Sequence, residues 1–331
     1  MVKLKEKYDP EGFLDEYLDW GNKLYESYLS GREYMVDGYE RIAIVGMGGS
    51  GIVGDIIRDI SYDRFKGLII PVKDDGLPLH INSEYLVIGV SYSGNTFETL
   101  KSVRNAMNRG CKLILVSTGG KMGEMAREMG IDFIEVSESL APRSGLPQLL
   151  GSTLGILSRL LDIRDKAIRG ISKTLTDDGS KYSIEREFNR AFEVAYDMWG
   201  RQPILYADVK YASLLHRGKS SLNENAKINV YYSVFPEAYH NEVEAYEYIQ
   251  DPIILPVIFM DDEDELMPFI NHLEEMKIEH LMINLYGEGH LEKLLRGILL
   301  IDVASIYLAY LLRRRPLDTD VINKLKGVRQ G

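Results

Sequence analysis

Two short loops in the first third of the sequence carry glycines and hydroxyl groups in an arrangement suited to binding a phosphate group. The first loop, Gly46 to Gly51, reads GMGGSG and follows the apolar run IAIV. The second loop, Ser91 to Thr96, reads SYSGNT and follows another apolar run. A glycine-rich turn from a strand into a helix exposes backbone N–H groups to an anion. The two loops therefore predict a site for a phosphorylated ligand.

The hydroxyl groups of the second loop indicate which kind of phosphate the site would take. Ser91, Ser93 and Thr96 can each donate to a phosphate oxygen, and the backbone N–H groups of Asn95 and Thr96 can add to them. The loop lacks the lysine of a P-loop, so we expect a terminal phosphate monoester on a small molecule. The alternative is that these residues cap the following helix. Three hydroxyls in six residues exceed what capping needs.

The first loop also satisfies the GxGxxG pattern of dinucleotide-binding folds. That interpretation needs an acidic residue about 20 positions later, and Asp74 and Asp75 come slightly late for it. A dinucleotide site has no use for a hydroxyl-rich second loop, so we interpret both loops as walls of one phosphate site. Ser50 would then supply a hydroxyl, while Gly48 and Gly49 would let the ligand approach the backbone.

The elements that would position these loops alternate regularly between residues 41 and 160. Apolar runs predict strands, and longer amphipathic stretches predict helices between them. The expected strands are 42–45, 68–72, 86–90, 112–116 and 133–136, and the expected helices are about 51–60, 95–108, 121–129 and 147–161. This alternation is typical of a parallel sheet covered by helices on both faces. Right-handed crossovers then place both loops on the same edge of the sheet.

The second half of the chain repeats this architecture without the glycine-serine loop. Strands at 203–206, 228–232, 253–259 and 281–285 alternate with helices at about 208–217, 263–276 and 291–312. After the first of these strands the sequence reads YADVKYAS, so we expect one phosphate site per chain, in the first half. The predicted organisation is a helical segment 1–38, an α/β domain 39–162, a linker and helix 163–185, and a second α/β domain 186–331, which ends in a helix capped by Asp318 or Thr319.

The composition argues against several classes of protein. The net charge of −11 over 331 residues disfavours nucleic-acid binding, which needs a basic face. Cys111 is the one cysteine, which rules out an internal disulfide and fits a reducing cytoplasm. We find no apolar run of the ~20 residues that a membrane helix needs, and no apolar core of a signal peptide at the start. The six histidines show no metal-ligand spacing, so we expect neither a metal nor a cofactor.

Two charged residues could carry out chemistry on a bound substrate. Glu224 lies between the amides Asn223 and Asn225 in the stretch NENAK. A partly buried carboxylate held by neighbouring amides suits a base that accepts and returns a proton. Arg143 follows the last strand of the first domain, where a guanidinium could stabilise a negatively charged intermediate. The alternatives are a helix-surface glutamate and an ordinary salt bridge.

Several stretches together resemble one family. GMGGSG with SYSGNTxET resembles the SIS (sugar isomerase) domain proteins. APRSGLP at 141–147, NENAK at 223–227, PEAYHNE at 236–242 and PLDTDVINKLK at 316–326 are similar to the archaeal bifunctional phosphoglucose/phosphomannose isomerases. These matches extend over about residues 40–326. The resemblance implies two tandem SIS-type domains of flavodoxin-like fold that interconvert fructose 6-phosphate with glucose 6-phosphate and mannose 6-phosphate.

The resemblance also assigns roles to individual residues. Glu224 would transfer the proton without a metal, and Arg143 would stabilise the intermediate. His240 would open the sugar ring, contributed by the neighbouring subunit of a homodimer. Lys326 would assist ring opening, although Lys324 is close enough that the register stays open. Thr319 would contact the sugar near C2 and C3.

Two other functions stay open at this point. Another SIS enzyme, acting on an amino-sugar or heptose phosphate, would use the same loops, although NENAK and HNE argue against it. A non-catalytic sensor of phosphosugars would usually carry a DNA-binding domain, of which the sequence gives no sign. Related sequences tend to have alanines after Arg143, where this chain has Ser144 and Gly145, so the detailed geometry of that loop also stays open.

Overall fold

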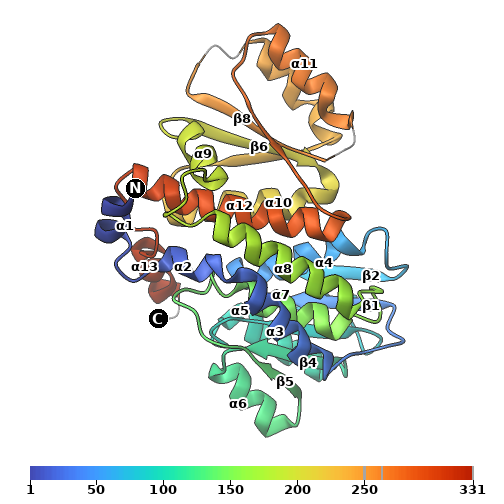
Figure 1. The fold of residues 1–331 in the computed structure, drawn as a ribbon. Helices are drawn as coiled ribbons and strands as arrows, with labels where there is room; N and C mark the ends of the chain where they lie inside the picture. Colours follow the sequence, from blue (N-terminus) through green and yellow to red (C-terminus); the bar gives the residue numbers. More distant parts are fainter. Residues whose placement is uncertain (249–250, 262–263, 330–331) are drawn as a thin grey trace.

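The computed structural model describes residues 1–248, 251–261 and 264–329, which form two parallel β-sheets flanked by helices (Figure 1). The first sheet has the strand order β2-β1-β3-β4-β5, and the second has the order β7-β6-β8-β9. The strands are β1 Arg41–Val45, β2 Leu68–Val72, β3 Leu86–Val90, β4 Lys112–Ser117, β5 Asp132–Glu135, β6 Gln202–Asp208, β7 Tyr231–Phe235, β8 Ile254–Met260 and β9 Leu281–Asn284. The predicted α/β class with two helix-flanked parallel sheets is confirmed.

The first sheet separates two apolar layers because successive side chains of a strand point to opposite faces. Ile42 and Ile44 of β1 join one apolar cluster, whereas Ala43 and Val45 join the other. Helices α4 and α7 pack in the first layer, and α5 and α6 pack in the second. These helices are α4 Gly48–Ser61, α5 Phe97–Asn108, α6 Gly120–Met129 and α7 Leu146–Leu157.

The second sheet packs against the same central cluster as the first. Leu205 of β6 and Leu308 of α12 belong to the cluster that also contains Ile44 of β1. Helix α12 lies between the two sheets (Figure 1), while α11 covers the opposite face of the second sheet through Phe269. The remaining helices of this half are α9 Arg190–Asp197, α10 Ala212–Ser221, α11 Met267–Glu275, α12 His290–Leu311 and α13 Asp320–Arg329, with short turns η1 Val209–Tyr211, η2 Leu222–Ala226, η3 Glu237–His240, η4 Glu242–Glu247 and η5 Asp264–Leu266.

Helix α12 is the helix that the sequence predicts at about 291–312, and the structure shows where its apolar surface lies. By length and composition this helix is apolar enough to cross a membrane, since an 18-residue stretch of it has a mean hydropathy of 1.8. However, 89% of that stretch is buried inside the protein. Because α12 packs between two sheets, apolar residues are needed around its whole circumference. We therefore assign α12 as a core helix.

The position of strand β7 also differs from the prediction. The sequence placed this strand at 228–232, whereas the structure places it at Tyr231–Phe235. The preceding helix continues through η2 to Ala226, so the chain reaches the sheet later than expected. β7 is an edge strand, and Tyr231 and Tyr232 are exposed on it. An edge strand lacks the continuous burial that makes a central strand recognisable from sequence.

The N-terminal helices are α1 Val2–Tyr8, α2 Phe13–Leu18 and α3 Trp20–Arg32, and α2 and α3 are built into the interior. Phe13, Tyr17 and Trp20 are fully buried in the central cluster. The Asp9 carboxylate accepts hydrogen bonds from the backbone N–H of Phe13 at 2.6 Å and from the hydroxyl of Tyr310 at 2.6 Å. Residues near the two ends of the chain are therefore joined, and helices α1 and α13 lie on the same side of the molecule (Figure 1).

Glycines allow α3 to pack directly on α7 and on α8 (Asp165–Lys181). A Cβ atom added to Gly31 would lie 2.1 Å from the carbonyl oxygen of Ser152, and one added to Gly21 would lie 2.1 Å from that of Ser172. On α7, a Cβ at Gly155 would lie 2.3 Å from the carbonyl oxygen of Tyr28. The backbones touch at these points, so a methyl group cannot be inserted without separating the helices.

We expect Gly31→Ala to destabilise the protein by about 1–3 kcal/mol, because the added methyl group must push α3 away from α7. The matched control is Gly170→Ala on the exposed surface of α8, where nothing lies within 4 Å of the added Cβ. That change should stabilise by up to about 1 kcal/mol through helix propensity. Denaturant unfolding of both variants measures the difference. Equal stabilities would show that the α3–α7 contact can relax freely.

Candidate active site

The two glycine-hydroxyl loops lie side by side at the carboxyl edge of the first sheet. The first loop leads from β1 into α4, and the second leads from β3 into α5. The backbone N–H of Tyr92 donates to the hydroxyl of Ser50 at 2.9 Å, which joins the loops directly. A Cβ on Gly46 would lie 2.8 Å from the carbonyl oxygen of Val90, so the backbones also meet closely. The sequence-predicted pairing of these loops is therefore present in the structure.

The side chains of the second loop differ in their exposure to solvent and therefore in their access to a ligand. Ser91 is buried, and its hydroxyl donates to that of Thr96 at 3.2 Å. Ser93 is exposed, and its hydroxyl accepts from the backbone N–H of Asn95 at 3.2 Å. The Asn95 side chain accepts from the N–H of Lys121, which ties the loop to α6. The hydroxyls of Ser93 and Thr96 thus stand at the open side of the loop, with Ser91 behind them.

Arg143 connects the first loop to the second half of the chain. A Cβ on Gly49 would lie 3.4 Å from the Cα of Arg143, so this arginine stands against the loop. Its guanidinium donates from Nε to the Asn225 side-chain oxygen at 2.7 Å and from Nη2 to the carbonyl oxygen of Pro316 at 2.6 Å. The guanidinium carbon also lies 4.8 Å from the ring centre of Phe13. Four separate segments therefore meet at one buried cation.

Glu224 stands beside Arg143 on a π-helical turn. The turn η2, Leu222–Ala226, continues α10, and its wider i→i+5 spacing is often found at functional sites. The Glu224 carboxylate lies 3.7 Å from Nη1 of Arg143, and its side chain is 28% exposed against 5% for Arg143. The carboxylate is therefore accessible from solvent while its cationic neighbour is held from behind. This pair lies close to the first loop because Arg143 contacts both.

Asn223 and Asn225, the amides on either side of Glu224, do not hold its carboxylate as the sequence suggested. Asn225 accepts from Arg143 and donates to the hydroxyl of Ser305 at 2.8 Å, so it positions the arginine. Asn223 donates to the carbonyl oxygen of Ile228 at 3.1 Å. In the part of the chain that the structure describes, neither amide hydrogen-bonds to Glu224. The prediction that these amides hold the Glu224 carboxylate is therefore wrong in this structure, because both side chains are used elsewhere.

A buried ion pair supports the site from beneath. Arg217 of α10 and Asp302 of α12 form a two-pronged contact, with Nε–Oδ1 and Nη2–Oδ2 distances of 2.9 and 2.8 Å, and both side chains are almost completely buried. Arg217 also donates to the backbone carbonyl oxygen of Arg143 at 2.8 Å. Burial acts to lower the pKa of Arg217, but the charge and hydrogen bonding of Asp302, together with the nearby Tyr17 and Glu224, raise this pKa above its usual value. The pair fixes α10 below the turn that carries Glu224.

Helix α10 is also fixed to α4, the helix that begins in the first loop. The Asp55 carboxylate contacts Nδ1 of His216 at 2.9 Å and the ammonium of Lys73. Burial alone would raise the pKa of Asp55, but hydrogen bonds and charges from His216 and Lys73 hold it below its usual value. In addition, Asp59 accepts from the backbone N–H of Ser213 at 2.7 Å. The loop and the π turn are therefore positioned on two mutually fixed helices.

Three other predicted site residues are placed as follows. Thr319 is half-buried and directly precedes α13. Lys326 lies on α13, but its side chain falls outside the described part of the structure. The assignment of Lys326, and not Lys324, as the lysine of the site therefore stays a prediction. His240 lies on η3 and is exposed. Within residues 1–248, 251–261 and 264–329 it makes no hydrogen bond or ion pair, either with Glu224 or with another residue.

Gly145, in the loop after Arg143, has a specific packing role. A Cβ at this position would lie 2.4 Å from the ring of Tyr92, and that ring is fixed because its hydroxyl donates to the carbonyl oxygen of Ser139 at 2.8 Å. The large Tyr92 side chain therefore fills the space that an alanine methyl group would need. Sequence reasoning did not anticipate this contact.

Other supporting residues were also missed, although one left a signal. Asp302 interrupts the apolar stretch LLIDVASI, and a charged residue in such a stretch indicates a buried partner. The sequence did not show that the partner is Arg217. Phe13, which stacks under Arg143, gave no signal beyond an ordinary apolar position. In the described part of the chain, no group of three or more His, Cys, Asp or Glu side chains could hold a metal ion.

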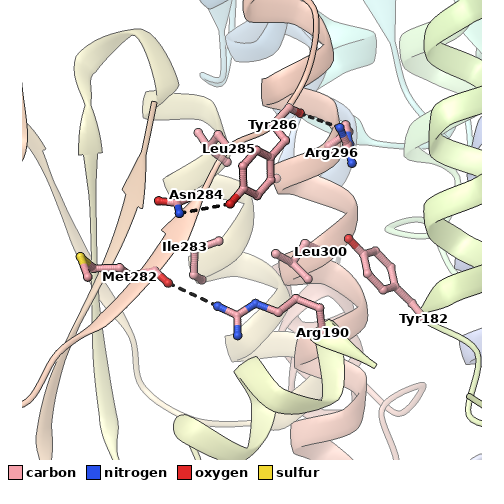
Figure 2. Close-up of a pocket in the computed structure, with 10 residues that line it drawn as sticks. Tyr182, Arg190, Met282, Ile283, Asn284, Leu285, Tyr286, Arg296 and Leu300 are labelled. Atoms are coloured by element: carbon pink, nitrogen blue, oxygen red, sulfur yellow. Dashed lines mark hydrogen bonds between the residues drawn. The ribbon is translucent and has the colours of Figure 1, made fainter. Parts of the chain in front are cut away.

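A well-defined pocket lies away from these residues, along β9, α9 and α12 (Figure 2). It has a volume of about 340 Å³ and contains none of the predicted site residues. Its cations are already engaged: Arg190 donates to the carbonyl oxygen of Met282 and pairs with Glu193, and Arg296 pairs with the buried Asp178. The chemistry points to the loops and the Arg143–Glu224 pair, and this pocket is a separate feature.

Comparison with known proteins agrees with this geometry. Residues 187–328 match the family model described as the bacterial phospho-glucose isomerase C-terminal SIS domain. The bifunctional phosphoglucose/phosphomannose isomerase of Aquifex aeolicus is 30% identical over 300 residues, covering 87% of this chain and 90% of that protein. The D-glucosamine-6-phosphate 4-epimerase of Sulfolobus acidocaldarius is 29% identical over 254 residues, covering 75% and 77%. The structure of a hypothetical Thermus thermophilus protein matches with a TM-score of 0.78 at 12% identity, covering 99% and 92%.

The two parallel sheets, the paired loops and the matching family model together define a phosphosugar isomerase of the SIS class. The sequence identity to the relatives and the share of each chain that is covered show which family of this class the chain belongs to. The chain belongs to the bifunctional phosphoglucose/phosphomannose isomerase family.

The buried Arg217–Asp302 pair makes a testable contribution to stability. We expect Asp302→Ala to cost about 3–5 kcal/mol, because it leaves an uncompensated guanidinium in the core. The control is Glu193→Ala, which removes an exposed partner of Arg190 and should cost less than about 1 kcal/mol. Denaturant unfolding measures both. Similar losses for the two variants would contradict the supporting role of the buried pair.

Proposed function

We propose that the chain interconverts fructose 6-phosphate with glucose 6-phosphate and mannose 6-phosphate through a cis-enediol(ate), with Glu224 as the proton-transfer base. The observation that carries this proposal is the position of the solvent-accessible Glu224 carboxylate, 3.7 Å from a buried arginine that stands against the glycine loop. This places a base beside a cation at the edge of the sheet where the hydroxyl-rich loops lie. Proton transfer next to a phosphate anchor is the arrangement that isomerisation of a sugar phosphate requires.

The phosphate would be held by the two loops. Hydroxyl groups and exposed backbone of the loops would bind its oxygens, and the sugar would extend from there towards Glu224. The residues in this role are Ser50, Ser91, Ser93, Thr96, Gly48, Gly49 and Asn95. Ser93 and Thr96 are best placed for direct contact, since Ser50 and Ser91 are buried behind the loop surface. Thr319, just before α13, would contact the sugar carbons.

The isomerisation itself moves one proton between two carbons. Starting from the aldose, Glu224 takes the proton from C2, and the electron pair forms the C1–C2 double bond while the carbonyl oxygen at C1 becomes negative. Glu224 then returns the proton to C1, the oxygen at C2 becomes the carbonyl, and its proton passes to the oxygen at C1. Arg143 would stabilise the negative oxygens, because Nη1 faces the side of the site where Glu224 stands.

Ring opening would precede this step and would use His240 and Lys326. A histidine can exchange a proton near neutral pH, which suits transfer between the ring oxygen and the anomeric hydroxyl. His240 is exposed and apart from Glu224 in the described structure, which supports its contribution to a neighbouring subunit's site in a homodimer. We further propose that the enzyme acts in the cytoplasm and without a metal ion.

A second candidate function is epimerisation of an amino-sugar phosphate. The observation that favours it is the similarity to the D-glucosamine-6-phosphate 4-epimerase of Sulfolobus acidocaldarius. Incubation with glucosamine 6-phosphate, followed by product analysis, separates the two functions. Turnover of that substrate without turnover of fructose 6-phosphate would favour the epimerase.

We expect Glu224→Gln to lower kcat for fructose 6-phosphate by about 10²- to 10⁴-fold, because the amide cannot accept the C2 proton. Substrate binding should persist, since the loops are unchanged. A coupled assay that reads both glucose 6-phosphate and mannose 6-phosphate measures the loss, with and without chelator. Full activity in Glu224→Gln would exclude the proposed base, and complete loss of wild-type activity in chelator would exclude the metal-free mechanism.

Mixed dimers test the origin of His240. We expect Glu224→Gln and His240→Ala subunits to be nearly inactive separately but to recover about a quarter of wild-type activity per chain when co-expressed, because half of randomly formed dimers carry one intact site. The measurement is the activity of the purified co-expressed mixture, compared with that of each variant expressed alone. No recovery in mixed dimers would show that one subunit supplies both groups.

A further inference from the structure

Lys227 occupies an unusual backbone position directly after the catalytic π turn. Its φ of +55° lies in the left-handed region, and its backbone N–H donates to the carbonyl oxygen of Leu222 to close the turn. Glycine or asparagine usually takes this position at a helix end, because a longer side chain is disfavoured there. Because a lysine is uncommon in this conformation, we examined which groups its side chain contacts.

The Lys227 ammonium is directed at backbone carbonyl groups. It donates to Asn225 at 3.2 Å, to Pro316 at 3.3 Å and to Arg315. An ammonium group has three N–H donors, so these three contacts use all of them. This arrangement suits a group that fixes two backbone segments. It is less suited to a group that delivers a proton to a substrate.

Two arginines reinforce the same junction. Arg314 donates from Nη1 to the carbonyl oxygens of Ala226 at 2.6 Å and Lys227 at 2.8 Å. Arg143 donates to the carbonyl oxygen of Pro316, which Lys227 also contacts. Carbonyl groups at the end of a helical segment lack helical partners and attract cations. Segments 225–227 and 314–317 are thus joined by cations from both sides.

We propose that Lys227 is a positioning residue that holds the C-terminal segment 314–319 against the π turn that carries Glu224. The proposal rests on the proposed function of Glu224. Glu224 precedes Lys227 by three residues, and Thr319 follows Pro316 by three residues. The clamp therefore sets the position of the base relative to the segment that leads into α13. Removing the amine would let the two elements shift against each other.

The charge of Lys227 provides one readout. Lys227 is exposed as a whole residue, but partial burial of its amine and the nearby Arg143 lower its pKa to about 8, while Asp318, Arg314 and Glu224 also face the amine. As the pH rises through 8 the amine loses one donor, so wild-type kcat should fall, whereas Lys227→Arg, which stays charged, should retain its kcat. The native pKa lies below the unfolded value near 10.4, so this group's contribution to folding stability rises over the same pH range. A fall in kcat would therefore not come from a loss of this group's contribution to stability, and the Lys227→Arg variant controls for other titrating groups.

The decisive comparison uses Lys227→Met, Lys227→Arg and the control Lys173→Met on the exposed face of α8. We expect Lys227→Met to lower kcat for fructose 6-phosphate by about 10- to 100-fold with little change in KM, because a small misplacement of catalytic groups has effects of that size. Lys227→Arg should restore most of the activity, and Lys173→Met should behave as wild type.

Hydrogen exchange separates this proposal from the proposed function. Backbone amides of residues 317–325 should exchange faster in Lys227→Met than in Lys173→Met, whatever the reaction catalysed. Unchanged exchange in Lys227→Met would overturn the clamp even if activity fell, and so would wild-type kcat. If Glu224→Gln proved fully active, the proposed base would fail, while the exchange result would still decide the role of Lys227.

Discussion

The buried guanidinium of Arg143 is the interaction on which the arrangement of the site depends. A guanidinium cannot be neutralised in a protein, so its burial requires that its donors find acceptors. Those acceptors come from the π turn and from the segment before α13, and the face of the cation rests on Phe13 from the N-terminal helices. The first glycine loop stands against the same residue. A site assembled from four distant segments thus has one common reference point.

The two halves of the chain have comparable sheets but divide the work of the site. The first half supplies the two glycine-hydroxyl loops, whereas the second supplies Glu224 through a helix that deviates into π geometry. This division is possible because the halves share one apolar cluster and the central helix α12. The Asp55–His216 contact and the Arg217–Asp302 pair then fix the helices that carry the two parts. The sheets provide the rigid frame, and these charged contacts set the distance between the first loop and the π turn.

Much of the fold could be predicted because buried parallel strands leave short apolar runs, as in β1 and β3. The paired loops could be predicted because strand ends of one sheet meet on one edge. Strand β7 was misplaced because the preceding helix continues through a π turn to Ala226, which nothing in NENAK signals. The same turn explains why Asn225 was assigned to Glu224 when it holds Arg143. Pairings such as Arg217 with Asp302 depend on distances between elements, which local sequence patterns do not contain.

The hydrogen bond between Asp9 and Tyr310 has a consequence for how the chain reaches its native state. The two residues are 301 positions apart, and Arg315 likewise pairs with Glu11. During synthesis the first helices emerge long before their partners in α7, α8 and α12 exist. Contacts of such sequence separation form late and slow folding. Helix α3 can pack once α7 and α8 exist, but the contacts of Asp9 and Glu11 must wait for nearly the whole chain. The support beneath Arg143 is therefore completed among the last steps of assembly.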